Sequence, residues 1–401
     1  MYGILRRQGT LEFYLRQLLH QPPEGIDQSV LLLLKLGLYQ LLYLERVPYH
    51  AAVNETVSLA RHAVPRASGL VNAVLRNFIR KKNKLNHPEQ IPEPAARIAA
   101  SFSVPIWIAE EWLGQFSAEE AMALASASSE IPPLTLRANT TLCTREKLLE
   151  TLAASDIAAT QCTFSPEGIS LHGRHRVTDI PGFHEGHFAV QDEASQIAVH
   201  LLAPLPGHSV LDVCAAPGGK TTHIAQLLEG NGILYATDIS SRKVQKITDS
   251  ARRLRLDRIQ TEVMDALSPE YMKGRGFDRI RLDVPCSGLG VIRRNPDARW
   301  RLKHDDFPFF ADRQRRLLDN IAPLLKPGGI LLYSTCSTAK EENELIINDF
   351  LSCNRGFVLE NMSVLFPGWD GLFSPEGNLR LWPHIHNTDG FFAARIKKAD
   401  R

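Results

Sequence analysis

Cysteine is scarce in this chain, and its spacing excludes two common kinds of small scaffold. The 401 residues include six cysteines, at positions 143, 162, 214, 286, 336 and 353. No two of them form a CxxC pair, so the sequence predicts neither a zinc ribbon nor a disulfide framework. Free thiols in a chain of this length fit the reducing cytoplasm.

The chain also lacks a large excess of charge of one sign, and it lacks long apolar runs. Lys and Arg number 46 against 44 Asp and Glu, a net charge of +2, so any affinity for nucleic acid must be local. The most apolar run, residues 30–44, contains Lys35 and is too short to span the roughly 30 Å of a bilayer core. The N-terminus lacks the residue order of a secretory signal. These absences predict a cytoplasmic protein without membrane contact.

The chain divides into a helical part and an α/β part. Apolar residues recur at helical spacing through residues 1–84, and residues 85–186 add further helices and a small α/β unit. In residues 187–401, strand-like segments alternate with helices; they lie at 209–215, 233–239, 259–266, 278–285 and 330–336. This alternation predicts an α/β domain with a doubly wound parallel sheet. Ligands of such sheets bind at the carboxyl ends of the strands.

The first of these strands runs into a glycine turn. Residues 210–220 read VLDVCAAPGGK, which has neither the spacing of a Walker A loop nor that of a GxGxxG loop, so phosphate binding is disfavoured. The second strand ends at Asp238 and the third in Asp265, where nucleoside sites place a carboxylate. This arrangement favours S-adenosylmethionine. The alternative is that both Asp residues only cap the helices that follow.

The fourth and fifth strands each run into a cysteine followed by serine, Cys286 and Cys336. Free cysteine usually fills apolar cores, but two cysteines at one sheet edge predict reactive thiols. A thiolate that adds to carbon 6 of a pyrimidine makes carbon 5 able to accept a methyl group. A carboxylic acid such as Asp283 at ring N3 would assist this addition, and a second thiol or a base would assist elimination. Spacing alone leaves the order of the two thiols open.

Several segments resemble one known family. They are VQDEASQ (190–196), LDVCAAPGGKTTH (211–223), DVPCSGLGVIRRNPD (283–297), KPGGILLYSTCS (326–337) and DGFF (389–392). They closely resemble the RNA 5-methylcytosine methyltransferases of the Sun, Fmu or RsmB type, which act on bacterial 16S ribosomal RNA. Residues 46–78 resemble the NusB-like domain of the same proteins.

The resemblance covers nearly the whole chain and implies its domain order. Residues 1–84 are expected to form an all-α NusB-like RNA-binding domain, and residues 85–186 a connecting domain of helices and a small α/β unit. Residues 187–401 are expected to form a Rossmann-like methyltransferase domain.

The resemblance also implies catalytic roles. Cys336 is similar to the nucleophile that attacks carbon 6, and Cys286 is similar to the thiol that helps to release the methylated RNA. Asp283 resembles the carboxylate between cofactor and cytosine, with Lys220 as its charge partner.

Other positions resemble the ligands of S-adenosylmethionine. Asp238 resembles the ribose ligand and Asp265 the adenine contact. The residues that resemble cofactor ligands are Cys214, Ala215, Ala216, Pro217, Gly218, Gly219, Lys220, Asp238, Asp265 and Asp283.

The chain departs from the family's pattern in three places. Val284 and Leu289 stand where the family usually has Ala and Thr, which affects the pocket volume and one hydroxyl contact. Arg281 lies within the fourth strand, where the family is usually apolar. Residues 1–6 resemble the middle of the NusB-like domain, which implies that its first helices are missing and that an apolar face is uncovered.

Local runs of basic residues are candidates for holding RNA. Residues 279–303 carry seven basic side chains and include Trp300, which predicts contacts with RNA and stacking on a base. Residues 242–258 are equally basic but indicate a solvated helix face. Residues 1–100 carry 13 basic and 7 acidic side chains and are expected to contact RNA phosphates. Because a thiol must approach the ring from above, the target cytosine is expected to be unpaired or flipped out.

Two other functions stay open: methylation of transfer RNA, and a non-catalytic NusB-like RNA-binding or antitermination factor. We expect 16S ribosomal RNA as the partner, no DNA, and a monomer. His384 and His386 lack a clustered third ligand, so the sequence predicts no metal site.

Overall fold

The computed structural model describes residues 2–268 and 270–400. The chain forms two compact units, one of residues up to 130 together with Ile292–Leu302, and one of Ile131–Val291 together with the residues from Lys303 onwards. None of the described helices is both long enough and apolar enough to cross a membrane.

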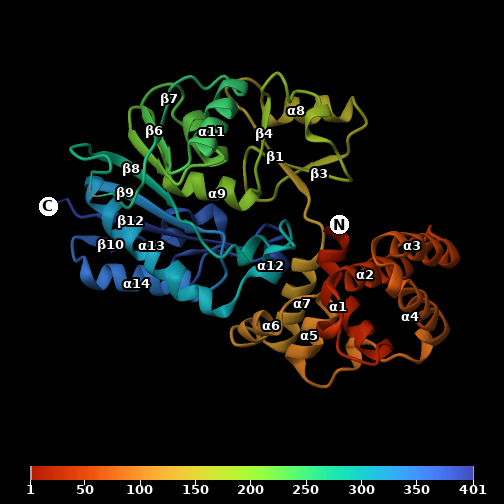
Figure 1. Cartoon of the computed structure of the whole chain (residues 1–401). Helices are drawn as coiled ribbons and strands as arrows, with labels where there is room; N and C mark the ends of the chain where they lie inside the picture. The colour runs from red at the N-terminus through yellow and green to blue at the C-terminus, as the bar shows by residue number, and fades with distance from the viewer. Residues whose placement is uncertain (1, 269, 401) are drawn as a thin grey trace. The chain divides into compact units, whose positions relative to one another are not determined.

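The smaller unit is helical, as its apolar spacing predicts. Its helices are α1 (Tyr2–Leu18), α2 (Gln28–Tyr43), α3 (Tyr49–Ala63), α4 (Ser68–Lys81), α5 (Pro94–Phe102), α6 (Ile106–Leu113), α7 (Ala118–Ser129) and α12 (Ala298–Arg301) (Figure 1). The carboxylate of Asp27 caps α2 by accepting hydrogen bonds from the backbone of Ser29 and Val30. Leu15, Leu34 and other buried side chains of α1 to α4 form one apolar core.

Helix α12 belongs to the smaller unit although its sequence lies between two segments of the larger one. Arg299 is fully buried and donates to the carbonyls of Ser128 (2.7 Å) and Ser103 (3.1 Å). The Nε1 of Trp300 donates to the carbonyl of Leu5 over 2.9 Å. The polar edge of the Trp300 ring is therefore bound within this unit, and stacking of its face on RNA stays a prediction.

The larger unit begins with a small antiparallel sheet. Its strands are β1 (Leu134–Ala138), β2 (Ala159–Gln161), β3 (Gly168–Leu171) and β4 (Phe188–Val190), in the order β2-β3-β1-β4. Helix α8 (Arg145–Ala153) packs against it through Leu148 and Leu152. This is the small α/β unit that the sequence predicts.

A second, larger sheet follows. Its strands are β5 (Ser209–Val213), β6 (Ile233–Asp238), β7 (Ile259–Val263), β8 (Phe277–Asp283), β9 (Leu325–Thr335), β10 (Phe357–Leu359), β11 (Leu379–Leu381) and β12 (Phe391–Lys398). The order is β10-β12-β9-β8-β5-β6-β7, and β11 pairs with β12. Strands β5 to β9 are parallel, and the strand order reverses between β5 and β8.

The prediction of a doubly wound sheet is confirmed, but the sheet is not parallel throughout. Strand β12, which contains Phe391 and Phe392 of the DGFF segment, lies inside the sheet and runs antiparallel to β9. Strands β10 and β11 are also antiparallel to β12. The sequence did not predict these antiparallel pairs, because the periodicity of a strand does not show whether its partner, far away along the chain, runs parallel or antiparallel to it.

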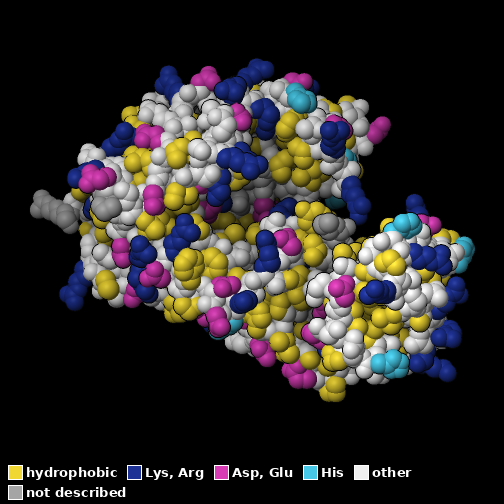
Figure 2. Space-filling view, viewed as in Figure 1, with side chains coloured by type: hydrophobic (Ala, Val, Ile, Leu, Met, Phe, Trp, Pro, Cys, Tyr) yellow, Lys and Arg dark blue, Asp and Glu magenta, His cyan; other side chains and the backbone are white. Residues whose placement is uncertain are grey.

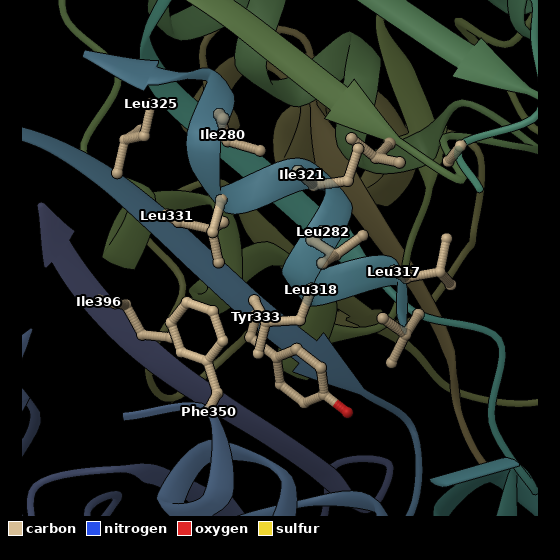
Figure 3. Close-up of a cluster of buried hydrophobic side chains, with 14 of the residues drawn as sticks. Ile280, Leu282, Leu317, Leu318, Ile321, Leu325, Leu331, Tyr333, Phe350 and Ile396 are labelled. Atoms are coloured by element: carbon tan, nitrogen blue, oxygen red, sulfur yellow. The ribbon is translucent and has the colours of Figure 1, made fainter. Parts of the chain in front are cut away.

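Helices cover both faces of this sheet, because successive side chains of a strand point to opposite faces. Leu282, Leu331 and Tyr333 pack against α13 (Phe307–Ile321) and α14 (Glu344–Cys353) (Figure 3). On the other face Val210 and Leu332 pack with α9 (Glu193–Leu202) and α10 (Gly219–Leu227). The further helices of the unit are α11 (Ser241–Arg253), α15 (Met362–Leu365) and α16 (Pro383–His386).

Candidate functional site

The glycine turn joins β5 to α10. Gly218 has a φ of 101°, a left-handed conformation that favours glycine. A Cβ atom at this position would lie only 3.0 Å from the Cα of Ile247 in α11. The turn therefore needs glycine both for its dihedral angle and for its close approach to α11.

Arg137, from β1 of the small sheet, holds the start of α10. Its side chain is fully buried and donates to the carbonyl of Gly219 (2.7 Å), to Thr222 Oγ1 (3.1 Å) and to the side-chain oxygen of Gln191. The sequence patterns did not reveal this residue. Its only signal was a charged residue inside a strand that otherwise has no charge.

A cavity of about 210 Å³ lies at the carboxyl ends of the strands beside this turn. Its lining includes Cys214, Ala216, Asp238, Asp265 and Asp283, all of which the sequence predicts as ligands of one cofactor. Ala215 is buried beneath them against Ala236 and Ile247. The structure thus brings the predicted acidic strand ends together around one space.

Two of these carboxylates also make local backbone bonds. Asp238 accepts a hydrogen bond from the backbone N–H of Ser240 (3.2 Å), and Asp265 accepts one from Leu267 (3.0 Å). The capping alternative therefore describes part of their bonding. Each carboxylate also lines the cavity, so a role as a cofactor ligand stays a prediction beside capping.

Asp283 at the end of β8 lies within a group of polar partners. Lys220 Nζ is 2.7 Å from Asp283 Oδ2, and Ser334 Oγ donates to Oδ1 over 2.6 Å. Arg281 Nη2 is 3.2 Å from Oδ2. The predicted Lys220 partner is thus in place, and Arg281 adds a second cation.

The register of the sheet explains why Arg281 reaches this position. Arg281 pairs with Asp212 across β5 and β8, so the two side chains leave the same face, and Asp283 follows two residues later on that face. Arg281 Nε is 3.0 Å from Asp212 Oδ1, and both side chains are buried. The unusual arginine in the fourth strand therefore occupies an ion-paired site between two carboxylates.

The neighbouring cations determine the charge state of Asp283. Burial by itself would raise the pKa of Asp283, but the charges of Lys220 and Arg281 outweigh it and hold the pKa below its ordinary value. Asp283 is therefore a carboxylate at neutral pH. It accepts hydrogen bonds in this state, and its assistance at ring N3 as an acid stays a prediction.

The two thiols meet beside this carboxylate. Cys286 follows β8 and Cys336 follows the adjacent parallel strand β9, and their sulfur atoms are 3.4 Å apart. A hydrogen bond with Cys336, together with burial, raises the pKa of Cys286 well above its ordinary value. Cys286 is therefore protonated at neutral pH, and its S–H can donate a hydrogen bond to the sulfur of Cys336.

Glu342 connects the residues that follow the two thiols. Its carboxylate is fully buried and accepts hydrogen bonds from the backbone N–H of Ser287 (2.8 Å) and from the hydroxyls of Ser287 and Ser337 (2.5 Å each). Gln314 Nε2 donates to the same carboxylate over 2.9 Å. The sequence did not reveal Glu342, because nothing in its local pattern distinguishes it from a surface glutamate.

The two remaining departures from the family's pattern are buried. Val284 is 4% exposed and Leu289 is 2% exposed. Val284 packs in the core shown in Figure 3, and its backbone N–H donates to the carbonyl of Ser334. Both side chains are therefore packed inside the larger unit.

Three segments of the chain match known protein families. Residues 199–397 match the family described as 16S rRNA methyltransferase RsmB/F. Residues 1–80 match the NusB family, and residues 104–178 match the ferredoxin-like domain of RsmF/B-like methyltransferases.

Individual relatives extend over the full chain. "Probable ribosomal RNA small subunit methyltransferase B" of Synechocystis is 36% identical, covering 100% of this chain and 90% of the relative. "Ribosomal RNA small subunit methyltransferase B" of Pseudomonas putida is 38% identical, covering 99% and 88%.

Solved structures agree in fold. The crystal structure of the protein named PH0851 superposes with a TM-score of 0.83 at 28% identity and covers 99% of this chain and 88% of its own. A methyltransferase homolog protein from Pyrococcus horikoshii gives a TM-score of 0.67 at 29% identity, covering 77% of this chain and 100% of its own.

Proposed function

Because the chain belongs to the RsmB/F family of 16S rRNA methyltransferases, we propose that it transfers a methyl group from S-adenosylmethionine to carbon 5 of a cytosine in 16S ribosomal RNA. One observation carries this proposal: two thiols lie 3.4 Å apart after neighbouring strands, and Asp283 of the cofactor cavity ends one of these strands.

The residues around the cavity fit S-adenosylmethionine. Bound there, this cofactor supplies an electrophilic methyl group on a sulfonium. Asp238, Asp265 and Asp283 line the cavity, and three carboxylates favour a cationic nucleoside over a pyrophosphate. Asp238 is proposed to bind the ribose hydroxyls and Asp265 the adenine, and the turn from Cys214 to Lys220 borders the methionine part.

Cys336 is proposed to attack carbon 6 as a thiolate. The bond from sulfur to carbon 6 forms as the carbon 5–carbon 6 double bond opens, and the electron pair placed at carbon 5 takes up the methyl group. The S–H of Cys286 is proposed to favour this step, because its sulfur lies 3.4 Å from that of Cys336 and can donate a hydrogen bond to the attacking sulfur.

The same step changes the acidity of Cys286. Once Cys336 is bound to the ring it carries no negative charge, so the main cause of the raised Cys286 pKa disappears. Cys286 then releases its proton to solvent and, as a thiolate, takes the proton from carbon 5. The electrons of that C–H bond restore the double bond and expel Cys336 as a thiolate.

Asp283 is proposed to orient the cytosine. Its ionised carboxylate accepts hydrogen bonds, and the exocyclic amine of cytosine is a donor. Lys220 and Arg281 hold the carboxylate in place and keep it ionised.

The surrounding RNA is proposed to bind the helical unit. Exposed basic side chains gather on α3 and α4 and on the segments that follow each helix; this basic face comprises Arg61, Arg66, Arg76, Arg80, Lys81 and Lys84 (Figure 2). Contacts from such a surface to phosphates hold RNA without reading its sequence. The target cytosine is expected to be unpaired or flipped out of its helix.

Mapping of 5-methylcytosine in total RNA tests the proposal. A strain lacking this gene should lose one modified cytosine in 16S ribosomal RNA, and the purified protein should restore it when S-adenosylmethionine is added. Loss of a site in transfer RNA would change the substrate but keep the chemistry. If no site were lost and calorimetry showed no binding of S-adenosylmethionine, a non-catalytic RNA-binding factor would be the better description.

A further inference from the structure

Three side chains outside the thiol site converge within the larger unit. Glu167 precedes β3, His200 lies in the last turn of α9, and His223 lies in α10. One potential ligand atom from each lies within 4.8 Å of the other two. His200 Nε2 is 2.9 Å from Glu167 Oε2, and His223 Nε2 is 3.8 Å from the same oxygen.

The environment of His223 indicates that a partner completes this group. Its side chain is fully buried, and neither ring nitrogen has a hydrogen-bond partner among the described residues. Leaving a buried polar group unpaired costs about 1–3 kcal/mol, and an ion or an ordered water is the usual explanation. Nε2 of this ring is the atom that faces Glu167.

The surrounding packing holds the three side chains in position. The rings of His200 and His223 pack edge to face with centroids 5.0 Å apart, and the ring of Trp369 packs against that of His200 at 5.9 Å. Glu167 is 7% exposed. Metal affinity benefits from such packing, because little side-chain entropy is lost on binding.

We propose that Glu167, His200 and His223 bind one divalent transition-metal ion, with zinc as the best match. Two imidazoles and one carboxylate are a common donor set for zinc, with a water as the fourth ligand. Imidazole also suits copper and nickel, whereas magnesium and calcium prefer oxygen donors only. For His200 to ligate through Nε2, its ring proton must lie on Nδ1, so the ion replaces the hydrogen bond to Glu167.

The position of the three ligands points to a structural ion. Glu167 belongs to the small antiparallel sheet region, whereas His223 is in the helix that starts at the glycine turn. An ion bound to both would tie the small sheet to this helix, in addition to the bonds made by Arg137. The sequence alone did not reveal this group, because its members come from three separate segments.

Metal titration of the full chain tests the proposal. The parent protein would carry Cys286→Ser and Cys336→Ser to remove zinc binding by the paired thiols, and a chelator would strip bound metal first. Calorimetry with Zn²⁺ should then show one strong site per chain, and Zn²⁺ should raise the Tm. Glu167→Gln and His200→Gln should each weaken binding by at least the roughly 10–100-fold that loss of an outer partner costs. His172→Gln, an exposed histidine of the same unit, should bind as the parent does.

Two results would overturn the proposal. One is a parent protein that binds no Zn²⁺ at one ion per chain, and the other is unchanged affinity in both ligand variants. Anomalous diffraction from crystals of the parent grown with Zn²⁺ decides the matter even if a variant fails to fold. A zinc peak between the three side chains supports the site, whereas a water there or a peak elsewhere refutes it.

Discussion

The two thiols of the site lie 3.4 Å apart after neighbouring strands of the same sheet. The hydrogen bond with Cys336 and burial raise the pKa of Cys286 well above its ordinary value, so Cys286 is protonated at neutral pH. A protonated Cys286 supports the proposal that Cys336 attacks the ring, which is the role that the family resemblance implies. Sequence spacing alone had left the order of the two thiols open.

Replacing Cys336 and replacing Cys286 should stop the reaction at different steps. Cys336→Ala should lower the methylation rate by on the order of 10⁴-fold or more, as loss of a nucleophile does, and should form no covalent product. Cys286→Ala should stop after methyl transfer, because nothing accepts the carbon 5 proton, and leave a protein–RNA adduct. Denaturing gels with labelled RNA would detect that adduct.

The exposed Cys353 provides the matched control. Cys353→Ala should turn over at the parent rate without an adduct. If the adduct accumulated with Cys336→Ala and not with Cys286→Ala, the two roles would be exchanged.

The charge of Asp283 predicts a pH effect. Lys220 and Arg281 oppose burial and lower its pKa below the ordinary 3.8. The ion pair therefore stabilises the native state above that pH, and the contribution is lost as the pH falls through the lower native pKa. Lys220→Met removes the nearer cation, so the pKa of Asp283 should rise. The acid limb of the kcat–pH profile should then move to higher pH.

Lys243→Met is the comparison for this measurement, because Lys243 is exposed and 3.8 Å from Asp238. Its acid limb should coincide with that of the parent. If the acid limbs of the kcat–pH profiles of the parent and of Lys220→Met coincided, Asp283 would not need the Lys220 charge to stay ionised.

At the scale of the element, strand register decides which polar groups meet. Asp212 and Arg281 are direct neighbours across β5 and β8, and Ser334 and Asp283 are neighbours across β8 and β9. A slip of one residue would turn all four side chains to the opposite face. The apolar cores on both faces of the sheet therefore fix the geometry of the polar site as well.

The glycine turn is a second element with a testable requirement. Gly218→Ala places a Cβ 3.0 Å from the backbone of Ile247 at a φ of 101°, so the turn must shift. The left-handed conformation alone costs roughly 1–2 kcal/mol. We expect the affinity for S-adenosylmethionine to fall by about tenfold or more, measured by calorimetry.

Gly207→Ala is the control that introduces the strain of a positive φ without a close contact to a neighbouring residue. Gly207 has a φ of 91°, but an added Cβ meets no atom within 4 Å. This variant should lose stability in urea by a similar amount while its cofactor affinity stays near that of the parent. Equal losses of affinity in the two variants would argue against a specific role of the glycine turn.

At the scale of the whole molecule, exposed basic side chains are concentrated locally although the chain is nearly neutral. The net charge is only +2, yet the basic face on α3 and α4 collects six exposed cations (Figure 2). Several arginines of the predicted second basic run, such as Arg281 and Arg299, are instead buried in ion pairs or carbonyl contacts. The basic face is exposed to solvent, and of the second run Arg301 and Lys303 are exposed as well.

Charge reversal on the basic face should weaken RNA binding. Arg76→Glu, Arg80→Glu and Lys84→Glu together should lower the affinity and reduce the slope of log K against log salt by about 0.7–0.9 for each phosphate that is no longer neutralised. Filter binding at several salt concentrations measures both quantities. Lys273→Glu, at an exposed position of the larger unit, should leave the slope unchanged; an unchanged slope in the triple variant would place the RNA elsewhere.

The sequence by itself determined the local elements and the ends of the strands. Helical spacing predicted α1 to α4, and alternation predicted β5 to β9, because burial of one face imposes a period on the residues. The carboxyl ends of parallel strands meet at one edge, so the order of strands and polar residues along the chain was enough to assign Asp238, Asp265, Cys286 and Cys336 to one site.

Only the tertiary structure decided which distant groups became partners. Arg137 beside the glycine turn, Glu342 between the serines and Arg281 between two carboxylates are ordinary charged residues in the sequence. The sequence patterns also did not predict that α12 belongs to the helical unit or that β12 pairs antiparallel to β9. Such contacts join segments far apart along the chain, and they arise when packed elements must satisfy buried polar groups, a requirement that has no period in the sequence.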